Sequence, residues 1–108
     1  MNIGQIAKMA QQMQTQMAQA QDELKQTTLE ATAGGGAVRI VITGAQEVRS
    51  VEIDPSAVDP DEVEMLQDLV MTAINEAIGR SKELERERMS GIAGAMGLPG
   101  MPGLPGFG

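Results

Sequence analysis

The sequence contains no Cys, His, Trp or Tyr, and its single aromatic residue is Phe107. Without Cys or His, the chain has no zinc finger, no thiol nucleophile and no imidazole base. We therefore predict that the protein is not an enzyme. An aliphatic core buries little area per side chain, although nine methionines are available as adaptable filler. In a chain of 108 residues, this predicts association with a second copy.

Long apolar runs are also absent from the sequence. No stretch approaches the roughly 20 apolar residues of a membrane span, and the N-terminus lacks the basic-then-apolar pattern of a secretion signal. We expect a soluble intracellular protein without membrane contact.

The net charge of −7 is distributed unevenly along the chain. Residues 1–50 carry equal numbers of basic and acidic groups, whereas residues 51–79 carry eight acidic groups and no Lys or Arg. Residues 80–108 carry a net charge of +1. The total charge disfavours nucleic acid as a partner, but its distribution leaves the two flanking regions open to anions.

The first segment has the pattern of a long amphipathic helix. Its apolar residues recur at spacings of three and four: Ile3, Ile6, Ala10, Met13, Met17, Ala20 and Leu24. About 22 residues at 1.5 Å each give a rod of roughly 33 Å, which the β-branched pair Thr27-Thr28 is expected to end. A helix this long on a small domain is expected to project or to pack against a partner.

Three short strands are predicted next, because apolar and polar residues alternate. The first two occupy residues 28–33 and 38–43, and the third ends at Ile53. Turns are expected at Gly34-Gly35-Gly36 and at residues 44–47. Sequential strands joined by short turns predict an antiparallel meander with one covered face.

Two Asp-Pro pairs follow the strands. Asp54-Pro55 ends the third strand, because Pro cannot donate to the ladder. Asp59 has the spacing of an N-cap, with Pro60 at the first helical position and Glu62 completing a capping box. These acids lack the spacing of a calcium loop, so we predict turn and capping roles and no metal or cofactor site.

A second long helix is predicted from apolar residues at helical spacing: Leu66, Leu69, Val70, Ala73, Ile74, Ala77 and Ile78. We expect it to reach the Arg86–Met89 region. From Ser90 onward, Gly recurs at every third residue, with Pro between the later ones. We therefore predict one α+β domain at residues 1–89 and a disordered Gly/Pro/Met tail at residues 90–108.

This order of elements resembles the YbaB/EbfC family of bacterial nucleoid-associated proteins. The resemblance covers roughly Ile3 to Met89 and is most specific in Val51-Glu52-Ile53-Asp54-Pro55, followed by Glu64-Met65-Leu66-Gln67-Asp68-Leu69-Val70. The first helix, rich in Met and Gln, is also similar to that family.

The resemblance implies a homodimer whose sheets join and whose long helices project like the arms of tweezers. It implies binding of double-stranded DNA with weak or no sequence preference, in the nucleoid of the cytoplasm, with effects on nucleoid organisation and gene expression. It implies neither catalysis nor a small-molecule substrate. The positions that correspond to its DNA-contacting helices are Lys8, Lys25, Arg80, Lys82, Arg86 and Arg88.

The sequence departs from the family pattern in its charges. The first helix of family members usually carries several lysines, whereas residues 3–25 hold only Lys8 and Lys25. The basic residues between Arg80 and Arg88 alternate with acidic ones, which fits either a row of phosphate contacts or internal ion pairs. The alternative function is a dimeric scaffold that binds a protein through its Met-rich helices or tail, with negligible DNA affinity.

Overall fold

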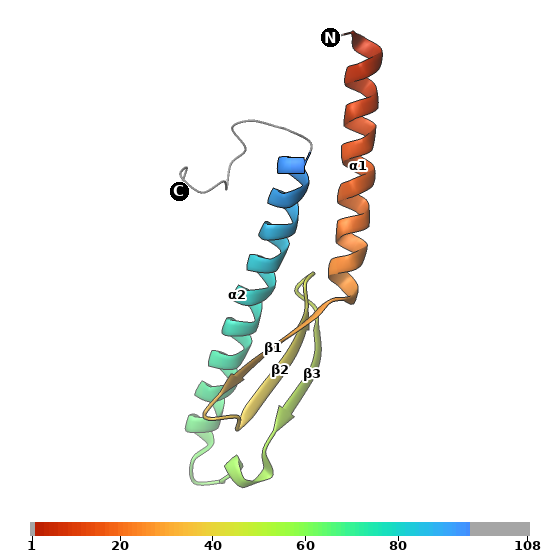
Figure 1. The fold of residues 1–108 in the computed structure, drawn as a ribbon. Coiled ribbons are helices and arrows are strands. Elements are labelled where there is room, and N and C mark those ends of the chain that lie inside the picture. The colour runs from red at the N-terminus through yellow and green to blue at the C-terminus, as the bar shows by residue number, and fades with distance from the viewer. Residues whose placement is uncertain (1, 96–108) are drawn as a thin grey trace, which may run out of the picture.

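The computed structural model describes residues 2–95, in which two long helices flank a three-stranded sheet (Figure 1). The elements are α1 (Ile3–Gln26), β1 (Thr28–Ala33), β2 (Val38–Thr43), β3 (Val48–Ile53), the short helix η1 (Pro55–Ala57) and α2 (Val63–Ala95). The molecule is elongated, with extents of 69 × 28 × 16 Å. The predicted α+β architecture and the order of its elements are confirmed.

Helix α1 begins and ends at side chains that bond to its backbone. The Asn2 side chain accepts a hydrogen bond from the Gln5 N–H at 2.8 Å. At the other end, the Thr27 N–H and hydroxyl both donate to the Glu23 carbonyl oxygen, at 2.9 and 2.8 Å. Only Ala20 and Leu24 of α1 are buried, and its N-terminal half extends beyond the described end of α2 (Figure 1). The helix therefore projects, as its length predicted.

The sheet is the predicted antiparallel meander in the order β1-β2-β3. The turn between β1 and β2 needs glycine, because Gly34, Gly35 and Gly36 all have positive φ, at 66°, 68° and 97°. At Gly34, a Cβ would also lie only 3.0 Å from the Leu69 side chain.

Helix α2 covers β1 and β2 but not β3. Ala73 and Ala77 of α2 are buried against apolar side chains of the first two strands. Those strand residues are Ala31, Ala33, Val38, Ile40 and Ile42. Every residue of β3 is exposed. The small alanines allow the helix to approach the sheet closely, and the core consequently lies on one side of it.

The start of α2 differs from the prediction. Asp59 does not cap the helix directly, because α2 begins only at Val63. The Asp59 carboxylate instead accepts from the Asp61 N–H at 2.9 Å, and its carbonyl oxygen accepts from the Glu62 N–H at 2.9 Å. These bonds close a separate turn before the helix, which Pro60 favours through its fixed φ.

The end of α2 also differs, because the helix continues to Ala95 instead of ending in the Arg86–Met89 region. Residues 90–95 are therefore helical although Gly91 and Gly94 weaken the helix. This end of α2 lies beside α1, since Ile92 lines a depression with Gln16 and Ala20. The rest of the predicted disordered tail, residues 96–108, lies outside the described residues. Within residues 2–95, neither helix is long and apolar enough to cross a membrane.

Candidate nucleic-acid interface

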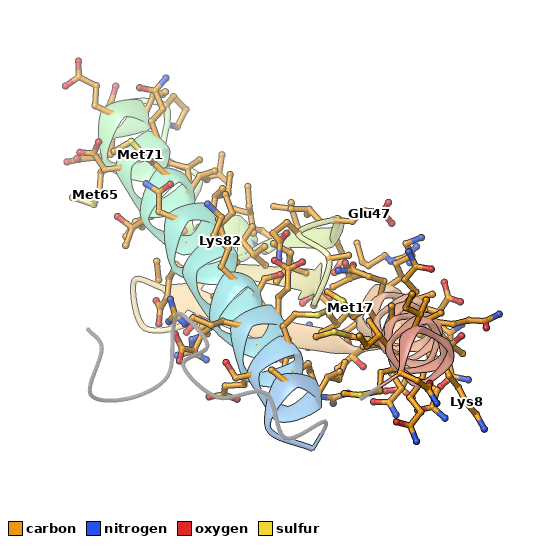
Figure 2. All side chains as sticks on the ribbon, turned by 90° about the horizontal axis from the view of Figure 1, so that it is seen from above. Lys8, Met17, Glu47, Met65, Met71 and Lys82 are labelled. Carbon is orange, nitrogen blue, oxygen red and sulfur yellow. The ribbon has the colours of Figure 1, made fainter. Side chains whose placement is uncertain are left out.

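The six basic residues predicted to contact DNA are all exposed, but they do not form one cluster. Lys8 and Lys25 lie on α1, and the other four lie on the C-terminal half of α2. Figure 2 shows Lys8 pointing away from α2, whereas Lys82 lies on α2, apart from Lys8. The structure thus offers basic groups on both helices and on more than one side.

Arg80 is bonded within its own helix and to the sheet. Its guanidinium contacts the Glu76 carboxylate at 2.8 Å, one helical turn away. It also donates to the Glu30 carbonyl oxygen of β1 at 3.0 Å. Arg80 therefore ties one flank of α2 to β1, the outer strand on that side.

Arg86 and Arg88 are also ion-paired. Arg86 pairs with Glu83 on the same helix, and Arg88 reaches the Glu23 carboxylate of α1 at 3.2 Å. The arginine side chains remain 61 % and 41 % exposed, so each pair contributes little to stability and can be exchanged for another anion. Arg86–Glu83 is thus an ion pair inside the alternating segment, whereas Arg80 and Arg88 pair with carboxylates outside it.

The lysines differ from the arginines in this respect. Within residues 2–95, Lys8, Lys25 and Lys82 make no ion pair. Lys25 lies in the last turn of α1, where a positive charge is favoured by the negative end of the helix dipole. These three ammonium groups are the cations most readily offered to a phosphate.

On the face of the sheet that is turned away from α2, a different set of charged residues links the strands. Arg39 of β2 contacts Glu30 of β1 at 2.6 Å and Glu52 of β3 at 2.8 Å. The hydrogen bond from the Arg39 guanidinium holds the pKa of Glu30 below its ordinary value. Arg39 links all three strands, and its positive charge is already paired with two carboxylates of the sheet.

Sequence reasoning missed an uncovered apolar surface beside α2. The strand register pairs the β3 residues Val48, Val51 and Ile53 with buried core residues of β2, so these three side chains face the same side as the core. They nevertheless remain 43 %, 50 % and 38 % exposed, because α2 does not reach them. Alternation in the sequence identified this strand's apolar side, but not that the helix would leave it open.

Helix α2 carries a mainly apolar groove. Its volume is about 440 Å³. It is lined by Val63, Leu66, Gln67, Val70, Met71, Ile74 and Asn75. Because Arg80 places the opposite flank of α2 against β1, the groove lies on the flank toward β3. We call the exposed side chains of β3 and this groove together the uncovered apolar surface.

Charge separates the two ends of the molecule. All eight acidic residues of segment 51–79 lie on β3, on the connection that follows it, or on the first half of α2. This part of the molecule is remote from the tip of α1 (Figure 1). Residues 1–21 contain no Asp or Glu. A polyanion is therefore repelled least along the N-terminal part of α1.

Comparison with known proteins agrees with this fold. The YbaB/EbfC DNA-binding family matches residues 1–96. A protein of Chloroflexus aurantiacus named nucleoid-associated protein is 51 % identical over 94 residues, covering 87 % of this chain and 94 % of that protein. One of the same name from Acetivibrio thermocellus is 48 % identical over 93 residues, covering 86 % and 82 %.

A solved structure shares the fold. The crystal structure of the uncharacterized protein HP0035 from Helicobacter pylori matches with a TM-score of 0.77 at 23 % identity. The match covers 85 % of this chain and 97 % of that chain.

Proposed function

The chain belongs to the YbaB/EbfC DNA-binding family, and on that premise we propose that it is a non-enzymatic protein of the bacterial nucleoid, located in the cytoplasm. It binds duplex DNA as a homodimer, with weak or no sequence preference, and thereby influences nucleoid organisation and gene expression. The observation that carries this proposal is the family match over residues 1–96, supported by relatives named nucleoid-associated protein.

The projecting helices supply the groups for DNA contact. The proposed contacts are Lys8, Lys25, Arg80, Lys82, Arg86 and Arg88. The three lysines meet phosphates directly, whereas the three arginines exchange an exposed carboxylate for a phosphate. Contacts to the phosphate backbone position a protein without reading bases, which accounts for weak sequence preference.

The uncovered apolar surface supports the homodimer. A half-exposed row of Val48, Val51 and Ile53 on an edge strand leaves both apolar side chains and unpaired backbone groups open to solvent. A second copy that applies the same surface about a two-fold axis covers both rows at once. The two sheets then join, and the α1 helices of both copies extend from the joined body.

Fluorescence anisotropy of a labelled duplex, measured at several salt concentrations, tests the proposal. We expect binding that weakens as salt rises, with similar affinity for duplexes of unrelated sequence. Replacement of Arg80, Lys82, Arg86 and Arg88 by Ala should weaken binding most at low salt. Absence of binding at low salt would overturn the proposal.

A dimeric scaffold that binds another protein is the second candidate. It is favoured by the apolar side chains that α1 leaves in solvent, since Ile3, Ile6 and Met17 are 85 %, 51 % and 41 % exposed. A chain that dimerises but binds no duplex in the anisotropy titration would support this function instead.

A further inference from the structure

A row of polar side chains runs along one flank of α1, and its last member, Gln19, lines a depression with Arg88 and Ile92 of α2. Its members alternate at spacings of three and four residues, so they lie above one another on the helix: Gln5, Lys8, Gln12, Thr15 and Gln19. All five are exposed. Figure 2 shows Lys8 pointing away from α2 and Met17 on the side of α1 nearer α2. We call this set the amide row.

The fold itself makes little use of the amide row. Within residues 2–95, the side-chain amides of Gln5, Gln12 and Gln19 form no hydrogen bond, and Thr15 bonds only to the Gln11 carbonyl oxygen of its own helix, at 3.0 Å. Lys8 is the row's only charged member, and it makes no ion pair in this part of the chain. The amides are therefore free to bond to a ligand.

The surroundings of the row favour an anionic ligand, although Lys8 is the only charged residue in the row itself. All 15 acidic residues of the chain follow position 21, so no carboxylate precedes Asp22. The row also begins at the N-terminal end of α1, where the helix dipole is positive. A phosphate backbone that is repelled by segment 51–79 meets no acidic residue of α1 until Asp22, and the Glu23 carboxylate beside Gln19 is paired with Arg88.

The dimensions and chemistry of the row suit duplex DNA. From Gln5 to Gln19 the row spans about 21 Å, or roughly six base pairs at 3.4 Å each. A single helix fits the major groove, and each Gln amide offers donors and an acceptor to phosphate oxygens or base edges. Several such groups in line can bond to consecutive nucleotides.

We propose that the amide row contacts duplex DNA through neutral hydrogen bonds and supplies the part of the affinity that salt does not remove. This inference rests on the proposed DNA-binding function and specifies its chemistry. Neutral amides displace no condensed counterions, so their contribution is independent of salt, whereas each lysine that neutralises a phosphate adds to the salt dependence.

Two matched double variants test the inference: Gln12→Ala with Gln19→Ala, and Gln14→Ala with Gln21→Ala. Both remove two glutamines seven residues apart, but the second pair lies about 160° around the helix from the first. Ala favours the helix in each case, and melting temperatures check that both variants are folded. The full chain is titrated against a labelled duplex at several salt concentrations.

We expect the row variant to bind about tenfold more weakly at every salt concentration, with an unchanged slope of log K against log salt. The control variant should bind like the wild type. Lys8→Gln should instead reduce the slope, by about one unit per contacting lysine.

Equal binding by the row variant and the wild type would overturn the role proposed for the amide row, while leaving the proposed DNA binding intact. Equal weakening by the control variant would also overturn it, because the effect would not belong to this side of α1. Absence of wild-type binding at low salt would overturn both proposals.

Discussion

The Ser81 hydroxyl of α2 donates a hydrogen bond to the Thr43 carbonyl oxygen at the end of β2, over 2.6 Å. The same hydroxyl oxygen accepts from the Gln46 backbone N–H at 3.1 Å and from its side-chain amide at 2.9 Å. The buried serine thereby uses its one donor and both acceptor positions. Next to this group, the Gly44 N–H donates to the Leu24 carbonyl oxygen at 2.9 Å. One turn therefore joins α1, β2 and α2.

Ser81→Ala should destabilise the fold by about 1–3 kcal/mol, because three hydrogen bonds to Thr43 and Gln46 are lost. The Thr43 carbonyl oxygen and the Gln46 N–H then keep only the bond of 3.2 Å between them. Gln46 would also lose two of the contacts that hold it at a positive φ of 61°. Chemical denaturation measures the change. Ser90→Ala, in the same helix, is the control and should have little effect; equal stability of the two variants would contradict this role of Ser81.

Gly44→Ala should be destabilising for steric reasons alone. A Cβ at this position would lie 2.7 Å from Leu24 Cδ2 and 3.1 Å from the Leu24 carbonyl oxygen, so the end of α1 must move away. We expect a cost of about 1–3 kcal/mol. Gly79→Ala should instead stabilise the protein, because nothing lies within 4 Å of an added Cβ and Ala favours the helix. Thermal melting of both variants compares them, and a stable Gly44→Ala protein would show that the junction is loose.

The sequence predicts local structure well where a residue acts on its own neighbours. Alternating residues identified all three strands, and Thr27 ends α1 through its own side chain. Asp54 behaves in the same local way, since its carboxylate accepts from both the N–H and the hydroxyl of Ser56 after β3.

What the sequence could not reveal depends on contacts between distant segments. Nothing around Ser81 distinguishes it from an ordinary helical serine, because its partners lie 35 and 38 positions earlier. The pairing of Arg88 with Glu23 likewise depends on how α1 and α2 meet. The placement of α2 over β1 and β2, which leaves Val51 open, follows from packing and not from periodicity.

Val51→Lys should convert the proposed dimer to a monomer. The substitution places a charge in the centre of the exposed row on β3, where a second copy would bury it. Ser50→Lys is the matched control, because its neighbouring side chain lies on the other face of the strand. Sedimentation at micromolar concentration should show a dimer for the wild type and the control, and a monomer for Val51→Lys. A monomeric wild type would refute the homodimer.

The Arg39–Glu30 pair should make stability depend on acid pH. Arg39 holds the pKa of Glu30 below its ordinary value of 4.5, so the folded state favours the carboxylate. The stabilisation is present above the ordinary pKa and is lost as pH falls through the lowered one. Arg39→Gln should therefore be less stable than the wild type at neutral pH, and this difference should shrink in acid.

Melting temperatures of the wild type and Arg39→Gln, measured across this pH range at low salt, test the pair. The comparison cancels the contribution of Asp54, whose pKa is also lowered by hydrogen bonding to Ser56, because Asp54 is the same in both proteins. Since Arg39 also pairs with Glu52, Glu52→Gln in both backgrounds separates the contribution of Glu30. The difference should decrease in high salt, since both side chains are exposed. A difference that is constant with pH would show that Glu30 does not respond to Arg39.

Lys82 and Arg86 should contribute differently to DNA binding although they lie one helical turn apart. Arg86 already pairs with Glu83, so a phosphate contact must first break that pair. Within residues 2–95, Lys82 has no such competitor. Lys82→Ala should reduce the slope of log K against log salt by about one unit per contacting lysine, and Arg86→Ala by less.

The variant Glu83→Gln provides the decisive comparison for this difference. Removing the carboxylate frees the Arg86 guanidinium, so duplex binding should strengthen and the salt slope should become steeper in the anisotropy titration. In the Arg86→Ala background, the same change should leave a smaller gain, because only general repulsion is relieved. If Glu83→Gln strengthens binding equally in both backgrounds, then the ion pair does not restrain Arg86, and total charge alone governs this part of α2.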